Sequence, residues 1–151
     1  MIFALAAALA ACSPQSPTQA EIRAGAQSGL EQVPLTIHSA TGAHRFTVEV
    51  AATPEQQATG MMFRRSVPFD RGMIFPYGQS QNVAFWMRNT LVPLDIIFIR
   101  SDGTIVRIAT ARPLDETPVP SGEPVSAVLE IRGGRAAELG IREGDRVEWT
   151  R

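Results

Sequence analysis

The sequence contains no lysine, one cysteine and two histidines among its 151 residues. Without lysine there is neither a Schiff-base nucleophile nor a phosphate-loop lysine. A single cysteine excludes an internal disulfide framework and a cysteine-based zinc site. His38 and His44 lack the spacing of a His-Glu-x-x-His metal motif, and we interpret both as surface strand residues. We therefore expect neither a metal nor a cofactor.

The sequence also lacks an excess of charge of either sign. The 14 arginines are balanced by 15 acidic residues, so the formal net charge is -1. A nucleic-acid-binding protein needs a basic footprint, so we expect no nucleic-acid partner. The hydrophobic content of 44% argues against wholesale disorder, and the length fits one compact domain.

The first eleven residues are Met, Ile, Phe, Leu and Ala only. This run is typical of a signal peptide and is shorter than the roughly 20 residues of a membrane-spanning helix. Residues 9–12 read Leu-Ala-Ala-Cys, which resembles a bacterial lipobox and implies cleavage before Cys12 and a lipid on its sulfur. Ser13 resembles an outer-membrane sorting signal, so we expect an exported outer-membrane lipoprotein facing the periplasm. An ordinary secretory cleavage is the alternative.

Residues 12–32 are rich in Ser, Pro, Gln, Thr, Ala and Gly and show no apolar periodicity. Such a segment cannot bury enough surface to offset the entropy of ordering it. We predict that residues 1–11 are a signal peptide, that residues 12–32 are a flexible tether to the membrane, and that residues 33–151 form a single globular domain.

Within the domain, apolar residues alternate with polar ones in several short segments, as expected for half-buried strands. The segment 94–99 is almost continuously apolar and predicts a central strand buried on both faces. Thr53 and Pro54 predict the start of a short helix that ends at Gly60, and a second short helix is expected over 133–139. The expected strands are 35–37, 46–50, 73–75, 82–88, 94–99, 104–109, 125–131 and 146–150.

This order of elements predicts an α+β domain that is mainly β: a small antiparallel, partly closed barrel-like sheet with two short helices. Two loops are unusual. Residues 64–72 contain three arginines, and residues 111–124 contain four prolines. A connection as long as the second is either a ligand-facing segment or a surface crossover.

Several segments of the domain form a specific pattern. Residues 60–64 read Gly-Met-Met-Phe-Arg, 72–75 Gly-Met-Ile-Phe, 85–90 Phe-Trp-Met-Arg-Asn-Thr, 93–95 Pro-Leu-Asp and 128–130 Val-Leu-Glu. This pattern resembles the bacterial and archaeal family called domain of unknown function 192, over roughly residues 33–151. The resemblance implies a compact β-rich domain, often behind a secretion signal, and brings no established activity.

Two acidic residues stand among apolar neighbours in predicted strands. Asp95 shares a strand face with Ile97 and Ile99, and Glu130 lies between Leu129 and Ile131. A buried carboxylate is costly unless it is paired or hydrogen-bonded. One interpretation is an internal ion-pair or turn-capping network. The other is a polar binding cleft with a floor of Asp95 and Glu130 and a rim of Arg64, Trp86, Arg88 and Asn89.

We favour a non-catalytic, envelope-associated domain that binds a ligand or a protein partner, with no catalytic residues. Trp86 offers a stacking face for a sugar, and Arg64 and Arg88 offer forks for carboxylate or phosphate, so a small anionic or glycan ligand is expected. One alternative is a glycan hydrolase or transglycosylase that uses Asp95 and Glu130 as a carboxylate pair. Another is a soft-metal site of methionine thioethers, although methionine also fills core gaps. The methionines concerned are Met61, Met62, Met73 and Met87.

Overall fold

The computed structural model describes residues 28–150. The expected signal peptide, Cys12 and most of the expected tether lie outside the described residues. Within 28–150, no helix is long and apolar enough to cross a membrane. The elements in chain order are β1 (Gln32–Ser39), β2 (Gly42–Val50), α2 (Pro54–Thr59), β3 (Arg71–Gln81), β4 (Ala84–Phe85), β5 (Leu94–Ile99), β6 (Ile105–Ala111), β7 (Val119–Pro120), β8 (Val125–Arg132), α3 (Arg135–Leu139) and β9 (Arg146–Trp149).

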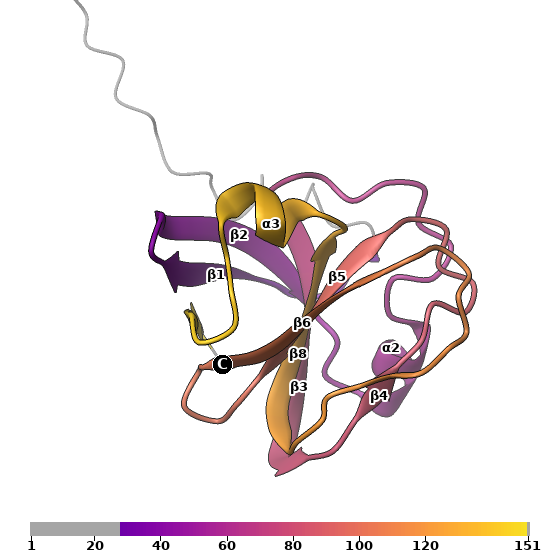
Figure 1. The fold of residues 1–151 in the computed structure, drawn as a ribbon. Coiled ribbons are helices and arrows are strands. Elements are labelled where there is room, and N and C mark those ends of the chain that lie inside the picture. The colour runs from indigo at the N-terminus through magenta and orange to yellow at the C-terminus, as the bar shows by residue number, and fades with distance from the viewer. Residues whose placement is uncertain (1–27, 151) are drawn as a thin grey trace, which may run out of the picture.

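Seven strands form one curled sheet in the order β6-β5-β8-β3-β2-β1-β9, which has the shape of a half-barrel (Figure 1). At one corner the two edges of the sheet meet, because Thr104 pairs with Arg146 and the Val147 N–H donates to the Gly103 carbonyl at 2.8 Å. The predicted mainly β, partly closed barrel with two short helices is thus confirmed. The pairing of β2 with β3 is parallel, whereas the other pairs in the sheet are antiparallel.

The sheet has an apolar core on each face, because side chains alternate along every strand. One core includes Ile97, Leu129 and, from α3, Ala136. The other includes Phe75, Phe98 and the segment after α2. Figure 1 shows α3 on one side of the sheet, and α2 and β4 together on the other. All six residues of β5 are buried, which confirms the predicted central strand.

The strand predicted over 82–88 is much shorter in the structure. Only Ala84–Phe85 is extended, and it pairs with Val119–Pro120 in a separate two-stranded sheet. Beyond it, the Met87 N–H donates to the Asp115 carbonyl at 2.9 Å. The backbone hydrogen bonds of this segment are therefore made with the proline-rich loop (residues 111–124) rather than with the main sheet.

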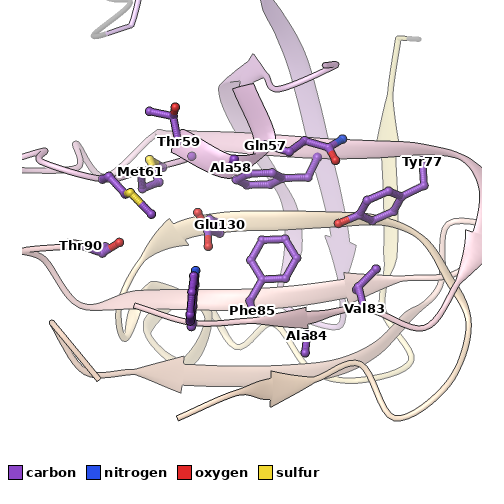
Figure 2. A pocket seen from close by; sticks show the side chains of 14 residues that line it. Gln57, Ala58, Thr59, Met61, Tyr77, Val83, Ala84, Phe85, Thr90 and Glu130 are labelled. Carbon is purple, nitrogen blue, oxygen red and sulfur yellow. The ribbon is translucent and has the colours of Figure 1, made fainter. Parts of the chain in front are cut away.

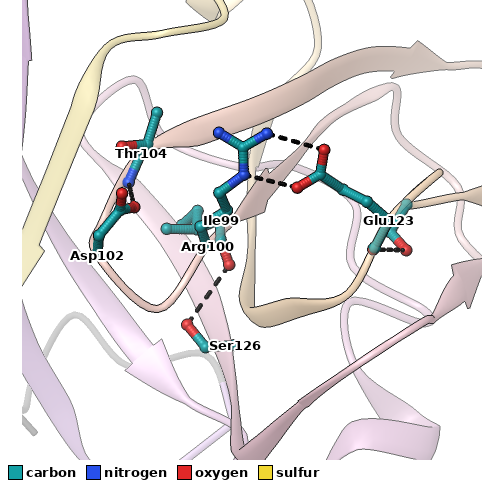
Figure 3. A network of polar contacts seen from close by, with 7 residues as sticks. Ile99, Arg100, Asp102, Thr104, Glu123 and Ser126 are labelled. Atoms are coloured by element: carbon teal, nitrogen blue, oxygen red, sulfur yellow. Dashed lines mark hydrogen bonds and ion pairs between the residues drawn. The ribbon is translucent and has the colours of Figure 1, made fainter.

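A polar network fixes the turn after β5 (Figure 3). The Arg100 guanidinium donates to both carboxylate oxygens of Glu123, at 2.6 and 2.8 Å. The Asp102 side chain accepts from the Thr104 N–H at 2.9 Å, which stabilises the tight turn between β5 and β6. These contacts attach the end of the proline-rich loop to the sheet.

Candidate functional site

Asp95 of β5 has no exposed surface and is fully hydrogen-bonded. Its Oδ1 accepts from the Thr110 hydroxyl at 2.6 Å and from the Gly134 N–H at 2.9 Å. Its Oδ2 accepts from the Ala136 N–H at 2.8 Å. The N-cap residue of α3 is a glycine with no side chain to cap the helix, so Asp95 satisfies the first turn of α3 from the neighbouring strand. The structure therefore places Asp95 in a capping network.

Glu130 of β8 lies on the opposite face of the sheet. In the pairing of β5 with β8, Glu130 is opposite Ile96, and Asp95 is opposite Ile131. Residues opposite each other project to the same face, and adjacent residues project to opposite faces. The sheet thus separates the two carboxyl groups, and they cannot flank one glycosidic bond as a two-carboxylate mechanism requires.

A pocket of about 380 Å³ lies beside Glu130. In Figure 2, the Glu130 carboxyl projects from β8 toward the space between Met61 and Thr90 on one side and Phe85 on the other. Tyr77 lies at the far end of the same pocket. The lining residues are Gln57, Ala58, Thr59, Gly60, Met61, Met62, Phe75, Tyr77, Val83, Ala84, Phe85, Trp86, Thr90 and Glu130.

The environment of Glu130 favours its neutral form. Its exposed fraction is 4%, and within residues 28–150 no hydrogen bond to its carboxyl is formed. Burial raises the pKa of Glu130 to about 8, although the positive charge of Arg64 acts in the opposite direction. Burial, and to a smaller extent the charge of Glu130, also raises the pKa of Tyr77 to about 12. Both groups are therefore mainly protonated at neutral pH.

Aromatic rings form much of the wall. Phe85 makes an edge-to-face contact with Phe75 at a centroid distance of 5.1 Å and another with Phe98 at 6.2 Å, so it is fixed against the core. Trp86 is 47% exposed at the rim, and the Arg88 guanidinium lies 5.5 Å from its ring centroid. The wall is therefore anchored at Phe85 and open to solvent at Trp86.

Strained backbone lies next to this rim. Among residues 28–150, the non-glycine residues with positive φ are Phe63, Asn89 and Leu114. The Phe63 N–H donates to the Asn89 carbonyl at 2.8 Å, and the Leu114 N–H donates to the Thr90 carbonyl at 3.0 Å. Three loops thus meet in conformations that cost about 1–3 kcal/mol per residue and that cluster at functional sites in proteins.

Arg64, one of the predicted rim residues, lies outside the pocket. Its guanidinium pairs with Glu49 at 2.5 Å, and both side chains are largely buried. Arg64 contacts Oε2 of Glu49, whereas Ser28 donates to Oε1 from its N–H at 2.9 Å and from its hydroxyl at 2.6 Å. Burial alone raises the pKa of Glu49, but the hydrogen bonds from Arg64 and Ser28 outweigh it and lower the pKa overall.

The other predicted rim residues lie near the pocket mouth. Arg88 and Asn89 are exposed, and the Asn89 amide contacts the Met62 sulfur at 3.9 Å. The structure thus brings Glu130 and Trp86 into one pocket with Arg88 and Asn89 beside it, and leaves Asp95 on the other face.

The methionines of the soft-metal hypothesis belong mostly to the apolar core. Met61, Met73 and Met87 are each at most 2% exposed and pack in the core that includes Phe75 and Phe98. Only Met61 and Met62 line the pocket. No group of three or more His, Cys, Asp or Glu residues that could hold a metal ion occurs within 28–150.

Sequence reasoning missed Tyr77, Phe85 and the residues from α2. The strand predicted over 73–75 continues to Gln81 in the structure, so Tyr77 continues the alternation of Met73 and Phe75 on the Glu130 face. This period of two was the signal that could have identified Tyr77. No local signal places Gln57 or Thr59 at the pocket, because the position of α2 depends on a crossover between strands.

Comparisons with known proteins identify the family. The family DUF192, described as Uncharacterized ACR, matches residues 36–149. No curated protein matches the chain. A protein of unknown function from Novosphingobium aromaticivorans is 46% identical, with a TM-score of 0.80 over 89% of this chain and 100% of that one. A proposed transcription regulator from Sinorhizobium meliloti is 42% identical, with a TM-score of 0.77 over 80% and 95%. The chain therefore belongs to the DUF192 family.

Proposed function

We propose that this domain binds a small molecule in the pocket beside Glu130 and Trp86, without catalysing a reaction on it. One observation carries the proposal: in a domain with two packed cores, the carboxyl group of a residue that is only 4% exposed faces about 380 Å³ of open space instead of a protein partner. Small-molecule pockets in proteins typically measure about 300–1,000 Å³ and combine apolar walls with a few polar groups.

The composition of the lining favours binding over catalysis. Its ionisable groups are Glu130 and Tyr77, and the raised pKa of Tyr77, about 12, makes it a poor base or acid near neutral pH. Nucleophilic catalysis needs a nucleophile beside a base, and glycoside cleavage needs a second carboxylate. Since Asp95 lies on the other face, the pocket lacks either pair.

The three strained loop residues support the same proposal. Phe63, Asn89 and Leu114 hold the segments next to Met62 and Thr90, which line the pocket. An unfavourable backbone conformation persists only where the surrounding structure enforces it. A binding function would explain why these three strained residues are retained next to the pocket.

The transcription-regulator description of the Sinorhizobium meliloti protein finds no support in the features of this chain. A formal net charge of -1 supplies no excess of positive charge for a phosphate backbone. The pocket is lined by aromatic and apolar residues with a few polar groups and contains no Arg, Lys or His, which suits a small ligand.

The proposal is tested by a thermal-shift screen of the full chain against sugars, amines, carboxylates and aromatic metabolites. A binder present at 100 times its dissociation constant adds about 2.7 kcal/mol of stability. We expect a hit whose shift is abolished in Trp86→Ala and retained in the control Trp149→Phe, which changes the other tryptophan. Circular dichroism checks that both variants fold. A screen without any hit, or hits unaffected by Trp86→Ala and by Glu130→Gln, contradicts the proposal.

A further inference from the structure

We infer that the ligand of this pocket is a small organic cation, an amine or alkylammonium whose charged nitrogen lies beside Glu130 and against the aromatic walls. The inference rests on the proposed function and names its ligand class. It follows from the charges of the lining, from its hydrogen-bonding groups and from the contacts around Glu130.

The pocket lining presents aromatic rings and thioether sulfurs and contains no positively charged side chain. None of its 14 lining residues is Arg, Lys or His, and Glu130 is the acidic one. The rings of Phe75, Tyr77, Phe85 and Trp86 present π systems, and Met61 and Met62 present thioether sulfurs. Aromatic walls attract cations through the ring quadrupole, and such cages recognise alkylammonium ligands.

Three polar side chains of the lining use their hydrogen-bond donors within the protein. The Gln57 amide donates to the carbonyls of Ala51 and Pro76, both at 3.1 Å. The Thr59 and Thr90 hydroxyls donate to backbone carbonyls at 3.1 and 3.2 Å. These side chains therefore offer mainly acceptor oxygens to a ligand, and an ammonium group, which only donates, suits them.

The expected anionic ligand fits this lining less well. The expectation of an anionic ligand relied on the guanidinium groups of Arg64 and Arg88, and neither residue lines the pocket. Arg64 shares its charge with Glu49 at 2.5 Å, and Arg88 stacks on Trp86. An anion in the pocket would lie beside Glu130 with its nearest cations already engaged, and it would gain no ion pair there, because a nearby negative charge further disfavours the ionised form of Glu130.

An ammonium ligand changes the protonation of Glu130. The ionisable groups that act on Glu130 are Arg64, whose partner is Glu49, and Tyr77 of β3, while Asp95 of β5 lies on the opposite face. Binding of a cation favours the carboxylate, so Glu130 releases its proton to solvent as the ion pair forms. With its pKa at about 8, affinity should rise about tenfold per pH unit below that value and level off above it.

The test compares cations with neutral molecules of the same shape. The probes are choline with 3,3-dimethyl-1-butanol, and n-butylammonium with n-butanol, titrated calorimetrically into the full chain at about pH 6, 7 and 8. We expect each cation to bind at least about tenfold more tightly than its neutral partner at about pH 8, with affinity falling as the pH is lowered. Trp86→Ala should weaken binding of both cations.

Glu130→Gln provides the matched control, because it keeps the size of the side chain and removes its charge. We expect the preference for the cation and its pH dependence to disappear in this variant, with folding verified by circular dichroism. Glu130→Met is a second neutral variant if Glu130→Gln does not fold.

Equal binding of cation and neutral probe, or a preference that survives both variants, overturns the inference. If a neutral ligand from the thermal-shift screen binds through Trp86 while both cations fail, the inference falls and the pocket function remains. If nothing binds, both fall.

Discussion

Asp95 and Glu130 come from adjacent strands and occupy neighbouring register positions, yet they differ in every contact. The Asp95 carboxylate accepts three hydrogen bonds from Thr110 and the start of α3. The Glu130 carboxyl accepts none from residues 28–150 and faces a pocket. A buried acid whose oxygens are satisfied is a structural group, whereas one that is desolvated beside open space has capacity left for a ligand.

The two environments differ because of what covers each face of the sheet. Over Asp95, the first turn of α3 supplies N–H donors that need an acceptor. Over Glu130, the segment after α2 supplies Met61 and Met62, which have no N–H or O–H group in their side chains. Three variants test this comparison.

At neutral pH, the largest loss of stability on substitution is expected for Asp95→Ala. It leaves the N–H groups of Gly134 and Ala136 and the Thr110 hydroxyl without their acceptor, so the free energy of unfolding should fall by about 3–5 kcal/mol. Urea denaturation measures this loss. The control Thr110→Val removes one of the three bonds and should cost about 1 kcal/mol. A loss below about 1 kcal/mol for Asp95→Ala would show that the capping network contributes little.

Arg64→Met should cost about 2–3 kcal/mol in unfolding free energy. The buried Glu49 carboxylate then keeps its hydrogen bonds from Ser28 but loses its positively charged partner. The substitution also removes the positive charge that lowers the pKa of Glu130, so that pKa should rise above its present value of about 8. Denaturation at several pH values measures both effects. The exposed neighbour Arg65 is the control, and Arg65→Met should change stability by at most about 0.5 kcal/mol. An unchanged pKa of Glu130 in Arg64→Met would contradict the assigned charge effect.

Glu130→Gln tests the other member of the comparison. The folded protein keeps a proton on Glu130 between its ordinary pKa of 4.5 and about 8, while the unfolded chain releases it. Over this range Glu130 therefore makes the folded state less stable as pH rises, by up to about 1.4 kcal/mol per pH unit. Glu130→Gln should lack this slope, which thermal denaturation between about pH 5 and 8 can show. Parallel pH profiles for the wild type and the variant would mean that Glu130 ionises normally.

Local patterns in the sequence were sufficient for individual elements. The continuous apolar run of β5 predicted its burial, and Thr53 with Pro54 predicted the start of α2, where the structure forms a capping box between Thr53 and Gln56. The alternation around Asp95 and Glu130 also predicted two buried acids. The same alternation does not indicate what covers each face of the sheet. It therefore could not predict that Asp95 caps a helix whereas Glu130 lies beside a pocket.

The pocket itself could not be predicted from local patterns, because segments distant in the chain form it. Phe85 was expected in a strand of the main sheet, but the backbone of its segment pairs with the proline-rich loop. The cap of α3 was equally hidden, since its donors and the Asp95 acceptor are about forty residues apart in the chain. Both features depend on tertiary contacts that no single segment encodes.

The parallel pairing of β2 with β3 has a consequence for how a ligand reaches the pocket. Parallel neighbours require a crossover, and here residues 51–70 supply it, including α2 and one wall of the pocket. No residue of α2 is buried, whereas β5 and β8 are buried along nearly their whole length. Local opening draws on the least buried parts of a protein. We therefore expect the amides of α2 to exchange before those of the central strands, so the wall of the pocket that α2 supplies is the part that gives way most readily to an entering ligand.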